Sequence, residues 1–154
     1  MIFINYMKLD DLDKNILSVL LDDSRLSYRQ IAKKTGVSVA TIMNRVNSLS
    51  KEGIIKKYTA LLDYEKLGYD VEVMIEVRIA KGKLIEVEKQ IATNPSVFAV
   101  YDMTGDFDAV ILARFPNRRK MDSFLKKIQT LDFVERTNTR IILNIIKEKQ
   151  VGII

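Results

Sequence analysis

The stretch GVSVATIMNRVNSLSKEG, residues 36–53, decides the fold of the first third of the chain. Its apolar residues recur at helical spacing and form one stripe: Val39, Ile42, Val46 and Leu49. The pattern predicts a helix of about fourteen residues between the two glycines. The opposite side of this helix is polar and comprises Thr41, Asn44, Asn47, Ser48 and Lys51, with Arg45 on the flank. The neighbouring segments have to show whether this polar side is solvated or contacts a partner.

The segment before it predicts a second helix that ends shortly before the first glycine. Ser27 is followed three residues later by Gln30, which is the spacing of a capping box. Gly36 suits the left-handed position after a helix, and Ser38 suits the N-cap of the next one. Only about four residues then separate the two helices, which is typical of a helix-turn-helix. An earlier apolar stripe predicts a helix in front of them, so an ordinary three-helix bundle is the alternative.

From residue 54 onward the apolar period changes from helical spacing to alternation. Strands are predicted near 54–63, over 71–80, on both sides of a turn at 104–106, and over 136–149, with helices within 81–93 and after Asn117. From residue 71 onward the order is β-α-β-β-α-β, which is that of a ferredoxin-like sandwich. The chain is therefore predicted to be α+β, with a helix-turn-helix domain over 8–60 that ends in a hinge strand at about 54–63, and a sandwich domain over 65–150.

The last predicted strand is apolar on both of its faces. Ile141, Leu143 and Ile145 alternate with Ile142 and Ile146. Helices over one side of an antiparallel sheet leave the other side for polar residues, so a second apolar face predicts a covering subunit. A folded C-terminal tail is the alternative cover.

Composition narrows the chemistry that the chain can perform. The 154 residues contain no histidine and no cysteine, which excludes disulfides, Ser–His and Cys–His nucleophile pairs and the usual transition-metal ligands. No segment approaches the ~20 apolar residues of a membrane span, and MIFINYMKLD lacks the features of a secretory signal. We therefore expect a cytoplasmic protein that is not an enzyme, with Met7 as an alternative start to Met1.

Positive charge is concentrated in one short segment. Between Ser24 and Tyr58 there are eight cations and a single anion, whereas the chain from Leu61 onward has 15 cations and 14 anions. The cations are Arg25, Arg29, Lys33, Lys34, Arg45, Lys51, Lys56 and Lys57. Such a concentration indicates a polyanionic partner for the helix-turn-helix.

Three stretches resemble the Lrp/AsnC, or feast/famine, family of transcription regulators. They are LDDLDKNILSVLLDDSR (9–25), IAKKTGVSVATIMNRVNSLSKEGIIKKYTALLDYEKLGYD (31–70) and TGDFD (104–108). The resemblance covers about residues 8–148, and GIIKKYTA followed by KLGYD is its most specific part. It implies an N-terminal domain that binds double-stranded DNA and a C-terminal sandwich that dimerises and often binds an amino acid. It also implies a homo-oligomer, with an octamer built as a tetramer of dimers.

The resemblance makes residues 38–51 a recognition helix whose first turns face the base edges. It implies a DNA contact set of Ser27, Tyr28, Arg29, Ser38, Val39, Thr41, Asn44, Arg45, Ser48, Lys56 and Lys57. Periodicity places Ile42 on the core stripe and leaves Val39 open between core and DNA. Arg45 is the strongest candidate, because its planar fork can bind guanine or phosphate in a bidentate manner. Each lysine taken alone is better explained as a solvated charge, whereas the eight cations together favour a polyanionic partner.

The family also implies an effector loop between dimers, here within residues 101–108. Its contact set is Tyr101, Met103, Thr104, Gly105, Asp106 and Asp108, joined by Thr137, Asn138 and Thr139 of a neighbouring subunit. Some members bind no effector, so the residues leave both outcomes open. Asp106 and Asp108 are expected on one face of a strand with Asp102 nearby. A carboxylate metal site is the alternative there, but aspartates beside a hairpin usually form turns, so no metal is predicted.

These observations predict a sequence-specific, dimeric transcription regulator. Two alternatives remain. One is an architectural DNA-binding protein of low sequence specificity, and the other is a metabolite-sensing module whose helix-turn-helix binds protein. Operator, effector and direction of regulation are not encoded in any motif of the chain.

Overall fold

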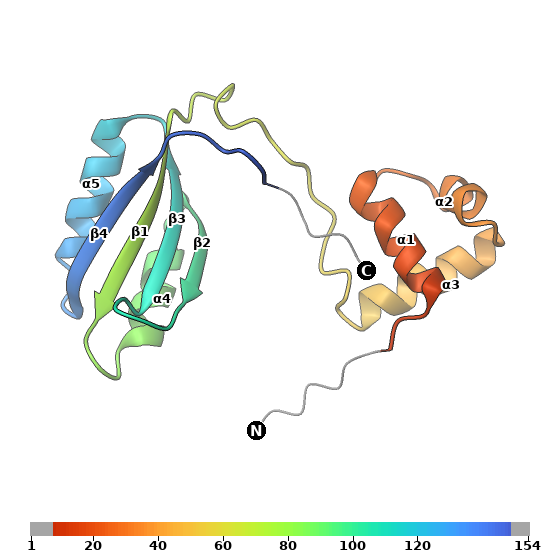
Figure 1. Ribbon diagram of the computed structural model, residues 1–154, viewed down its shortest axis with the longest axis horizontal. Helices are drawn as coiled ribbons and strands as arrows, with labels where there is room; N and C mark the ends of the chain where they lie inside the picture. Colours follow the sequence, from red (N-terminus) through yellow and green to blue (C-terminus); the bar gives the residue numbers. More distant parts are fainter. Residues whose placement is uncertain (1–7, 149–154) are drawn as a thin grey trace. The chain divides into compact units, whose positions relative to one another are not determined.

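The computed structural model describes residues 8–148, so the alternative start at Met7 lies outside the described residues. The chain divides into two compact units, and the second of them comprises Leu62–Ile146 (Figure 1). In the part that the structure describes, no helix is long and apolar enough to cross a membrane.

The first unit is built from three helices, α1 (Asp11–Asp22), α2 (Tyr28–Thr35) and α3 (Val39–Lys51). The side chains of Asp10, Ser27 and Ser38 cap their N-termini, and the first two form complete capping boxes. Gly36 ends α2 in the left-handed conformation at φ 74°. The predicted helix-turn-helix is confirmed, together with the residues that begin and end its helices.

The core of this unit explains how α3 is oriented. Ile42 is fully buried, together with Val46 and Leu49, against side chains of α1 and α2. Val39 is 44% exposed, so the first turn of α3 has only a partial share in the core. The periodicity is confirmed at Ile42, and Val39 lies on the exposed side of the helix.

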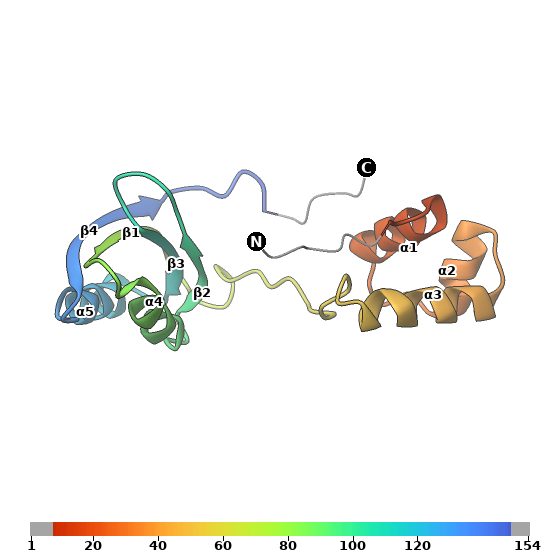
Figure 2. The ribbon, with the colours of Figure 1, turned by 90° about the horizontal axis from the view of Figure 1, so that it is seen from below.

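The second unit has the expected ferredoxin-like order. Its elements are β1 (Val71–Ile79), α4 (Leu84–Ala92), β2 (Val97–Asp102), β3 (Ala109–Phe115), α5 (Arg118–Gln129) and β4 (Val134–Ile142). All strand pairs are antiparallel, in the order β2-β3-β1-β4. Figure 2 shows both helices on the same side of this sheet. The alternating apolar residues of β1 form the centre of the core beneath them.

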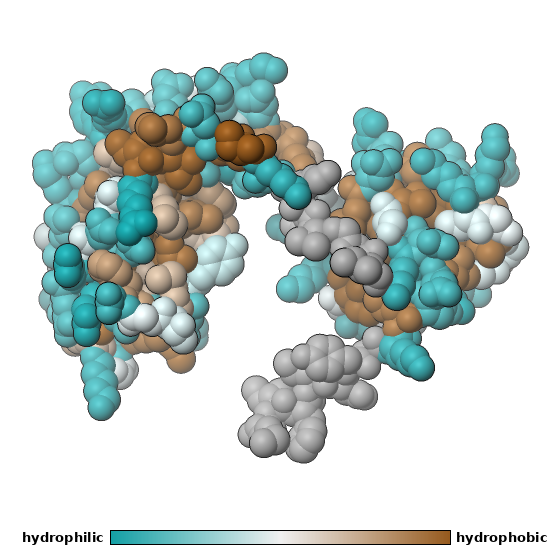
Figure 3. All heavy atoms as spheres, viewed as in Figure 1, coloured by the Kyte–Doolittle hydropathy of each residue, from teal (hydrophilic) through white to brown (hydrophobic). Residues whose placement is uncertain are grey.

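The other face of the sheet has no helix over it. Register places Glu72 opposite Arg114, and Met74 opposite Leu112, on this open face. Arg114 is paired with Glu72 and stacks over the rings of Tyr64 and Phe98. Figure 3 shows apolar side chains over this side of the sheet and over the segment that follows β4. The open face therefore combines an apolar centre with charges that are already paired.

The hinge strand expected at 54–63 does not form, so this prediction was wrong. Residues 56–63 have no regular secondary structure. The amides of Ile54 and Ile55 instead donate to the carbonyl of Leu49 and complete the end of α3. A single strand is not stable without a neighbour, and no other described strand lies beside this segment.

The last strand is also shorter than expected, because β4 ends at Ile142. Ile142 pairs with Glu72, and β1 begins only one residue earlier, at Val71, so the following residues have no partner strand. Leu143, Ile145 and Ile146 therefore lie outside the sheet and are exposed. The expectation that they alternate between two sheet faces was wrong, although Ile142 does lie on the open face.

Candidate nucleic-acid interface and effector loop

The outer side of α3 presents both polar and apolar groups to solvent. Asn44 and Asn47 are exposed, and Val39 and Met43 beside them are 44% and 43% exposed. Thr41 and Ser48 are half-buried at the edge of this side. Amides, hydroxyls and apolar groups are the side-chain types that contact base edges and thymine methyls in the major groove.

The first residues of α2 and α3 are held firmly by their caps. Ser27 Oγ accepts from the amide of Gln30, and the Gln30 side chain accepts in turn from the amide of Ser27 at 2.9 Å. Ser38 Oγ accepts from the Thr41 amide at 3.1 Å and lies 2.8 Å from Thr41 Oγ1. These bonds fix where each helix begins, and they leave Tyr28 and Arg29 exposed on the first turn of α2.

Tyr58 is a further residue of this unit that was not among the DNA contacts predicted from the sequence. Burial raises the pKa of the Tyr58 phenol, and the nearby phenol of Tyr28 raises it further. The phenols of Tyr58 and Tyr28 are therefore close enough to interact electrostatically. Lys56 and Lys57, which precede Tyr58, are both exposed.

Most of the positive charge in this unit is not neutralised by the protein. Of the eight cations, Arg25 is paired with Asp23 at 3.2 Å, and Arg45 is paired with acids of α1. The other six are exposed and have no ion pair within the described residues: Arg29, Lys33, Lys34, Lys51, Lys56 and Lys57. Uncompensated cations around an exposed helix are the electrostatic pattern of a nucleic-acid interface.

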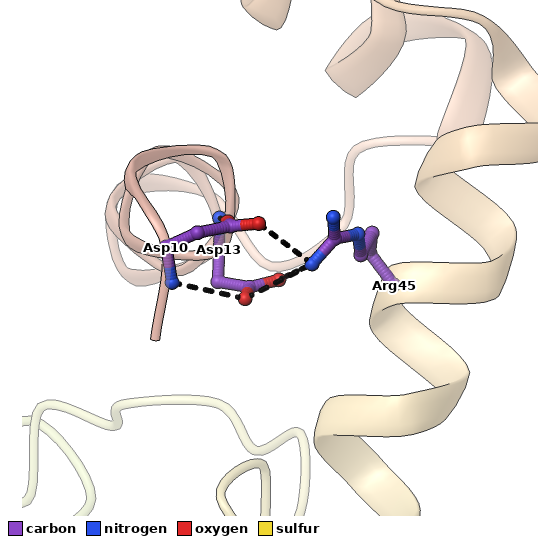
Figure 4. A network of polar contacts seen from close by, with 3 residues as sticks. All are labelled: Asp10, Asp13 and Arg45. Carbon is purple, nitrogen blue, oxygen red and sulfur yellow. Dashed lines mark hydrogen bonds and ion pairs between the residues drawn. The ribbon is translucent and has the colours of Figure 1, made fainter. Parts of the chain in front are cut away.

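Arg45 differs from the other predicted DNA contacts, because its guanidinium binds the start of α1 (Figure 4). Its Nη1 lies 2.9 Å from Asp10 Oδ2 and 3.2 Å from Asp13 Oδ2. Asp13 is only 2% exposed. Sequence reasoning missed both partners. The signal was an aspartate at a core-facing position of an amphipathic helix, since a buried carboxylate needs a cation or hydrogen-bond donors.

In the second unit, residues 103–108 connect β2 to β3. Asp106 and Asp108 lie in this loop rather than on one face of a strand, which corrects the expectation. The carboxylate of Asp108 accepts from the amide of Ile79 at 2.7 Å, and its own amide donates to Val77. Asp108 therefore anchors the loop to the end of β1. These two hydrogen bonds hold Asp108 directly before the first residue of β3.

Two arginines that the sequence did not single out connect this loop to the start of β4. Arg78 donates from Nη1 to the Asp106 carbonyl at 3.1 Å and pairs with Glu135 at 3.8 Å. The guanidinium of Arg136 lies 5.6 Å from the centre of the Phe107 ring. The two predicted effector segments thus meet within one chain. Tyr101, Thr104 and Gly105 remain exposed and Met103 is half-buried, with Gly105 at φ 119°.

The three predicted residues of β4 do not share one face of the sheet. Asn138 lies on the open face, and its Nδ2 donates to Glu76 Oε2 at 2.7 Å. Thr137 and Thr139 pair in register with Val77 and Ile75, on the face that the helices cover. Only Asn138 therefore presents its side chain on the open face. No group of three or more metal-ligating side chains is found among residues 8–148.

Comparison with models of known protein families identifies the domain type of both units. Residues 72–151 match the model of the Lrp/AsnC ligand binding domain, which spans more than half of the chain. The chain belongs to the Lrp/AsnC family. Residues 9–56 match a winged helix-turn-helix DNA-binding model, which covers α1, α2 and α3. This Lrp/AsnC protein is a transcription regulator with a DNA-binding helix-turn-helix and a ligand-binding domain.

Its relatives support the same assignment over nearly the whole chain. An uncharacterised HTH-type transcriptional regulator of Pyrococcus furiosus is 46% identical over 142 residues, covering 92% of this chain and 96% of the relative. The HTH-type transcriptional regulator FL11 of the same organism is 37% identical, covering 91% and 93%. These matches include both the helix-turn-helix and the sandwich.

Solved structures of the family have the same architecture. AsnC of E. coli superposes with a TM-score of 0.88 at 27% identity, covering 95% of this chain and 99% of its own. A Neisseria meningitidis transcriptional regulator in complex with L-Met gives a TM-score of 0.86 at 25% identity, covering 92% and 94%. LrpC of B. subtilis gives 0.84 at 31% identity, covering 93% and 100%.

Proposed function

We propose that this regulator reads double-stranded DNA with the exposed side of α3. The observation that carries the proposal is that Asn44 and Asn47 are exposed on α3 without side-chain hydrogen bonds within the described residues, in a unit that also has six exposed cations without an ion pair there. Ser38, Val39, Thr41, Asn44 and Ser48 contact base edges, because they lie at the start and on the outer side of the helix. Ser27, Tyr28, Arg29, Lys56 and Lys57 contact phosphates on either side.

Dimerisation is proposed to use the open face of the sheet. Met74, Leu112 and Ile142 lie on this face by register, and no described helix covers it. A large apolar patch on a sheet without a cover is typical of a subunit interface. A symmetric dimer built on it places two α3 helices against two half-sites, which favours a palindromic operator. Assembly of four dimers into an octamer, and action in the cytoplasm, where bacteria and archaea keep their DNA, complete the proposal.

The effector is proposed to be a small amino acid bound at the loop 103–108 between dimers. The family model for the second unit is a ligand-binding domain, and one structural neighbour was solved with L-Met. Tyr101, Met103, Thr104, Gly105 and Asp106 are accessible to such a ligand, and Asn138 lies on the open face nearby. Asp108, Thr137 and Thr139 contribute by shaping the loop and strand. Calorimetry against all twenty amino acids tests this part, and the absence of heat from every one of them excludes it.

The DNA proposal is tested with two duplexes of equal length. The operator-like duplex carries the sequence that the wild-type protein enriches from a pool of random duplex DNA, and the scrambled duplex has the same base composition in another order. Affinity for each duplex is measured over a range of salt concentrations. We expect a steep fall with salt, since each neutralised phosphate changes the slope of log affinity against log salt by about −0.9. We also expect the operator to bind at least ~10³-fold more tightly than the scrambled duplex. Equal affinities for the two duplexes indicate the architectural alternative. Salt-insensitive binding, or no binding, excludes the proposal.

A further inference from the structure

One nitrogen of Arg45 contacts two carboxylates, that of the α1 N-cap Asp10 and that of Asp13 in the first turn of α1. Arg45 Nη1 lies 2.9 Å from Asp10 Oδ2, 3.3 Å from Asp13 Oδ1 and 3.2 Å from Asp13 Oδ2. Asp10 and Asp13 also form the capping box of α1, in which the Asp13 amide donates to Asp10 Oδ1 at 2.8 Å. The contact therefore joins the middle of α3 to the first turn of α1 (Figure 4).

The place of Arg45 on α3 agrees with this contact. Successive residues of a helix are turned by about 100°, so Arg45 lies about 60° from Ile42 and about 40° from Leu49, both fully buried. It is about 100° away from Asn44, which is exposed to solvent. Arg45 thus borders the core stripe and faces α1, whereas the outer side of α3 is centred on other residues.

Burial of Asp13 makes the contact structurally important. A carboxylate that is 2% exposed is stable only when a cation or hydrogen-bond donors replace its water. Asp10 is accessible, and the backbone amide of Asp13 is the main cause that holds its pKa below the usual value, with Arg45 adding to the effect. Loss of Arg45 therefore leaves the buried carboxylate of Asp13 without its counter-ion, at the contact between α1 and α3.

We propose that Arg45 is a positioning residue that fixes α3 against α1, rather than a residue that reads a base. Its guanidinium sets the orientation in which α3 presents Thr41 and Asn44 to the groove, and it offsets two carboxylates that otherwise repel phosphate. This inference rests on the proposed DNA-binding function. It assigns Arg45 a positioning role in place of the DNA contact that the sequence predicts.

The two roles predict different responses to a second substitution. Arg45→Met keeps the apolar stem but leaves Asp13 unpaired, so a positioning role predicts loss of stability and of DNA affinity together. Asp13→Asn then removes the buried charge, and its side-chain oxygen still accepts from the Asp10 amide, so the double variant recovers both properties. A base contact predicts that the double variant recovers stability alone.

The experiment measures thermal unfolding and DNA affinity for wild type, Arg45→Met, Asp13→Asn and the double variant. Affinity is measured for the operator-like and scrambled duplexes, at a temperature where circular dichroism shows every variant folded. We expect Arg45→Met to weaken binding to the operator-like duplex about tenfold and to the scrambled duplex less, because Thr41 and Asn44 are no longer held toward the bases. We expect the double variant to return to within about threefold of Asp13→Asn for both duplexes. Arg25→Met is the matched control, because Arg25 also pairs with an aspartate but is highly exposed on a turn.

Arg45→Lys keeps the experiment decisive if Arg45→Met does not fold. An ammonium group still pairs with Asp13, so a positioning role predicts that the lysine variant keeps the wild-type ratio between the two duplexes. A changed base preference in Arg45→Lys, or a double variant that recovers its melting temperature but not its affinity, overturns the inference. Failure of the wild type to bind either duplex instead overturns the proposed function.

Discussion

The outer side of α3 and the candidate effector region, which comprises the loop 103–108 and Asn138 of β4, both carry polar side chains, but the protein uses them differently. Asn44 and Asn47 on α3 are exposed and make no side-chain hydrogen bond within the described chain. Asp108 and Asn138 are bonded to the amide of Ile79 and to the carboxylate of Glu76. Side chains that are hydrogen-bonded within the fold hold a site in place. Exposed side chains without such bonds are available to recognise another molecule.

Loss of the Asp108 carboxylate is expected to have the largest effect on the fold. Asp108→Ala leaves the half-buried amide of Ile79 without its acceptor, so we expect the second unit to lose about 1–3 kcal/mol of unfolding free energy. Chemical denaturation followed by circular dichroism measures this loss. Asp106→Ala is the control, because only its backbone carbonyl is bonded to Arg78. Equal losses in the two variants contradict the distinction between anchoring and accessible residues.

Loss of an exposed amide on α3 is expected to affect recognition and leave stability unchanged. Asn44→Ala removes donors and an acceptor that have no internal partner, so we expect operator affinity to fall about tenfold while the melting temperature stays the same. Fluorescence anisotropy with the operator-like duplex measures the change. Asn15→Ala provides the control, because Asn15 is an exposed amide on α1. A similar loss of affinity in the control argues against a specific role for α3.

Exposed lysines near α3 are expected to change the salt dependence more than the specificity. Lys56→Ala and Lys57→Ala should each reduce the steepness of log affinity against log salt by about 0.9, because each removes one phosphate contact. Affinity titrations at four salt concentrations measure the slope for operator and scrambled duplexes alike. Lys66→Ala serves as the control, since Lys66 lies in the second unit and pairs with Asp63 at 3.1 Å. Unchanged slopes place both lysines away from the DNA.

Acid is expected to produce the smallest effect, through Asp10. Its pKa is lowered from 3.8 in the folded protein, chiefly by the hydrogen bond from the Asp13 amide. A lowered folded pKa stabilises the fold above the unfolded value, and this contribution is lost as the pH falls through the folded pKa. The melting temperature of wild type should therefore fall toward that of Asp10→Asn as the pH drops below 3.8, the usual pKa of this carboxyl.

Much of the fold was predictable because its signals are local. Ser27 with Gln30, Gly36 and Ser38 define helix ends through bonds to residues three or four positions away. Alternation in β1 predicted its buried face for the same reason. The absent hinge strand and the early end of β4 could not be predicted, because a strand depends on the register of a distant neighbour.

The candidate sites show the same limit. The polar side of α3 follows from periodicity, whereas the DNA contact set depended on the resemblance of the chain to the Lrp/AsnC family. The partners of Arg45 could not, since Asp13 is 32 residues away and only packing brings the two together. The roles of Arg78 and Arg136 beside the loop also depend on how β1 and β4 align. Residue types were sufficient to identify candidate site residues. Only the tertiary contacts showed which of these residues hold the site in place and which are accessible to a partner.

The central claim is that the exposed side of α3 reads DNA sequence. The most direct test is selection of binding sites from a pool of random duplex DNA with the purified protein, at about 150 mM salt, where phosphate contacts alone are weakened. The account predicts enrichment of a palindromic motif with wild type, and a changed or weakened base preference with Asn44→Ala. Binding without enrichment, or the same motif at the same strength with Asn44→Ala, would contradict it.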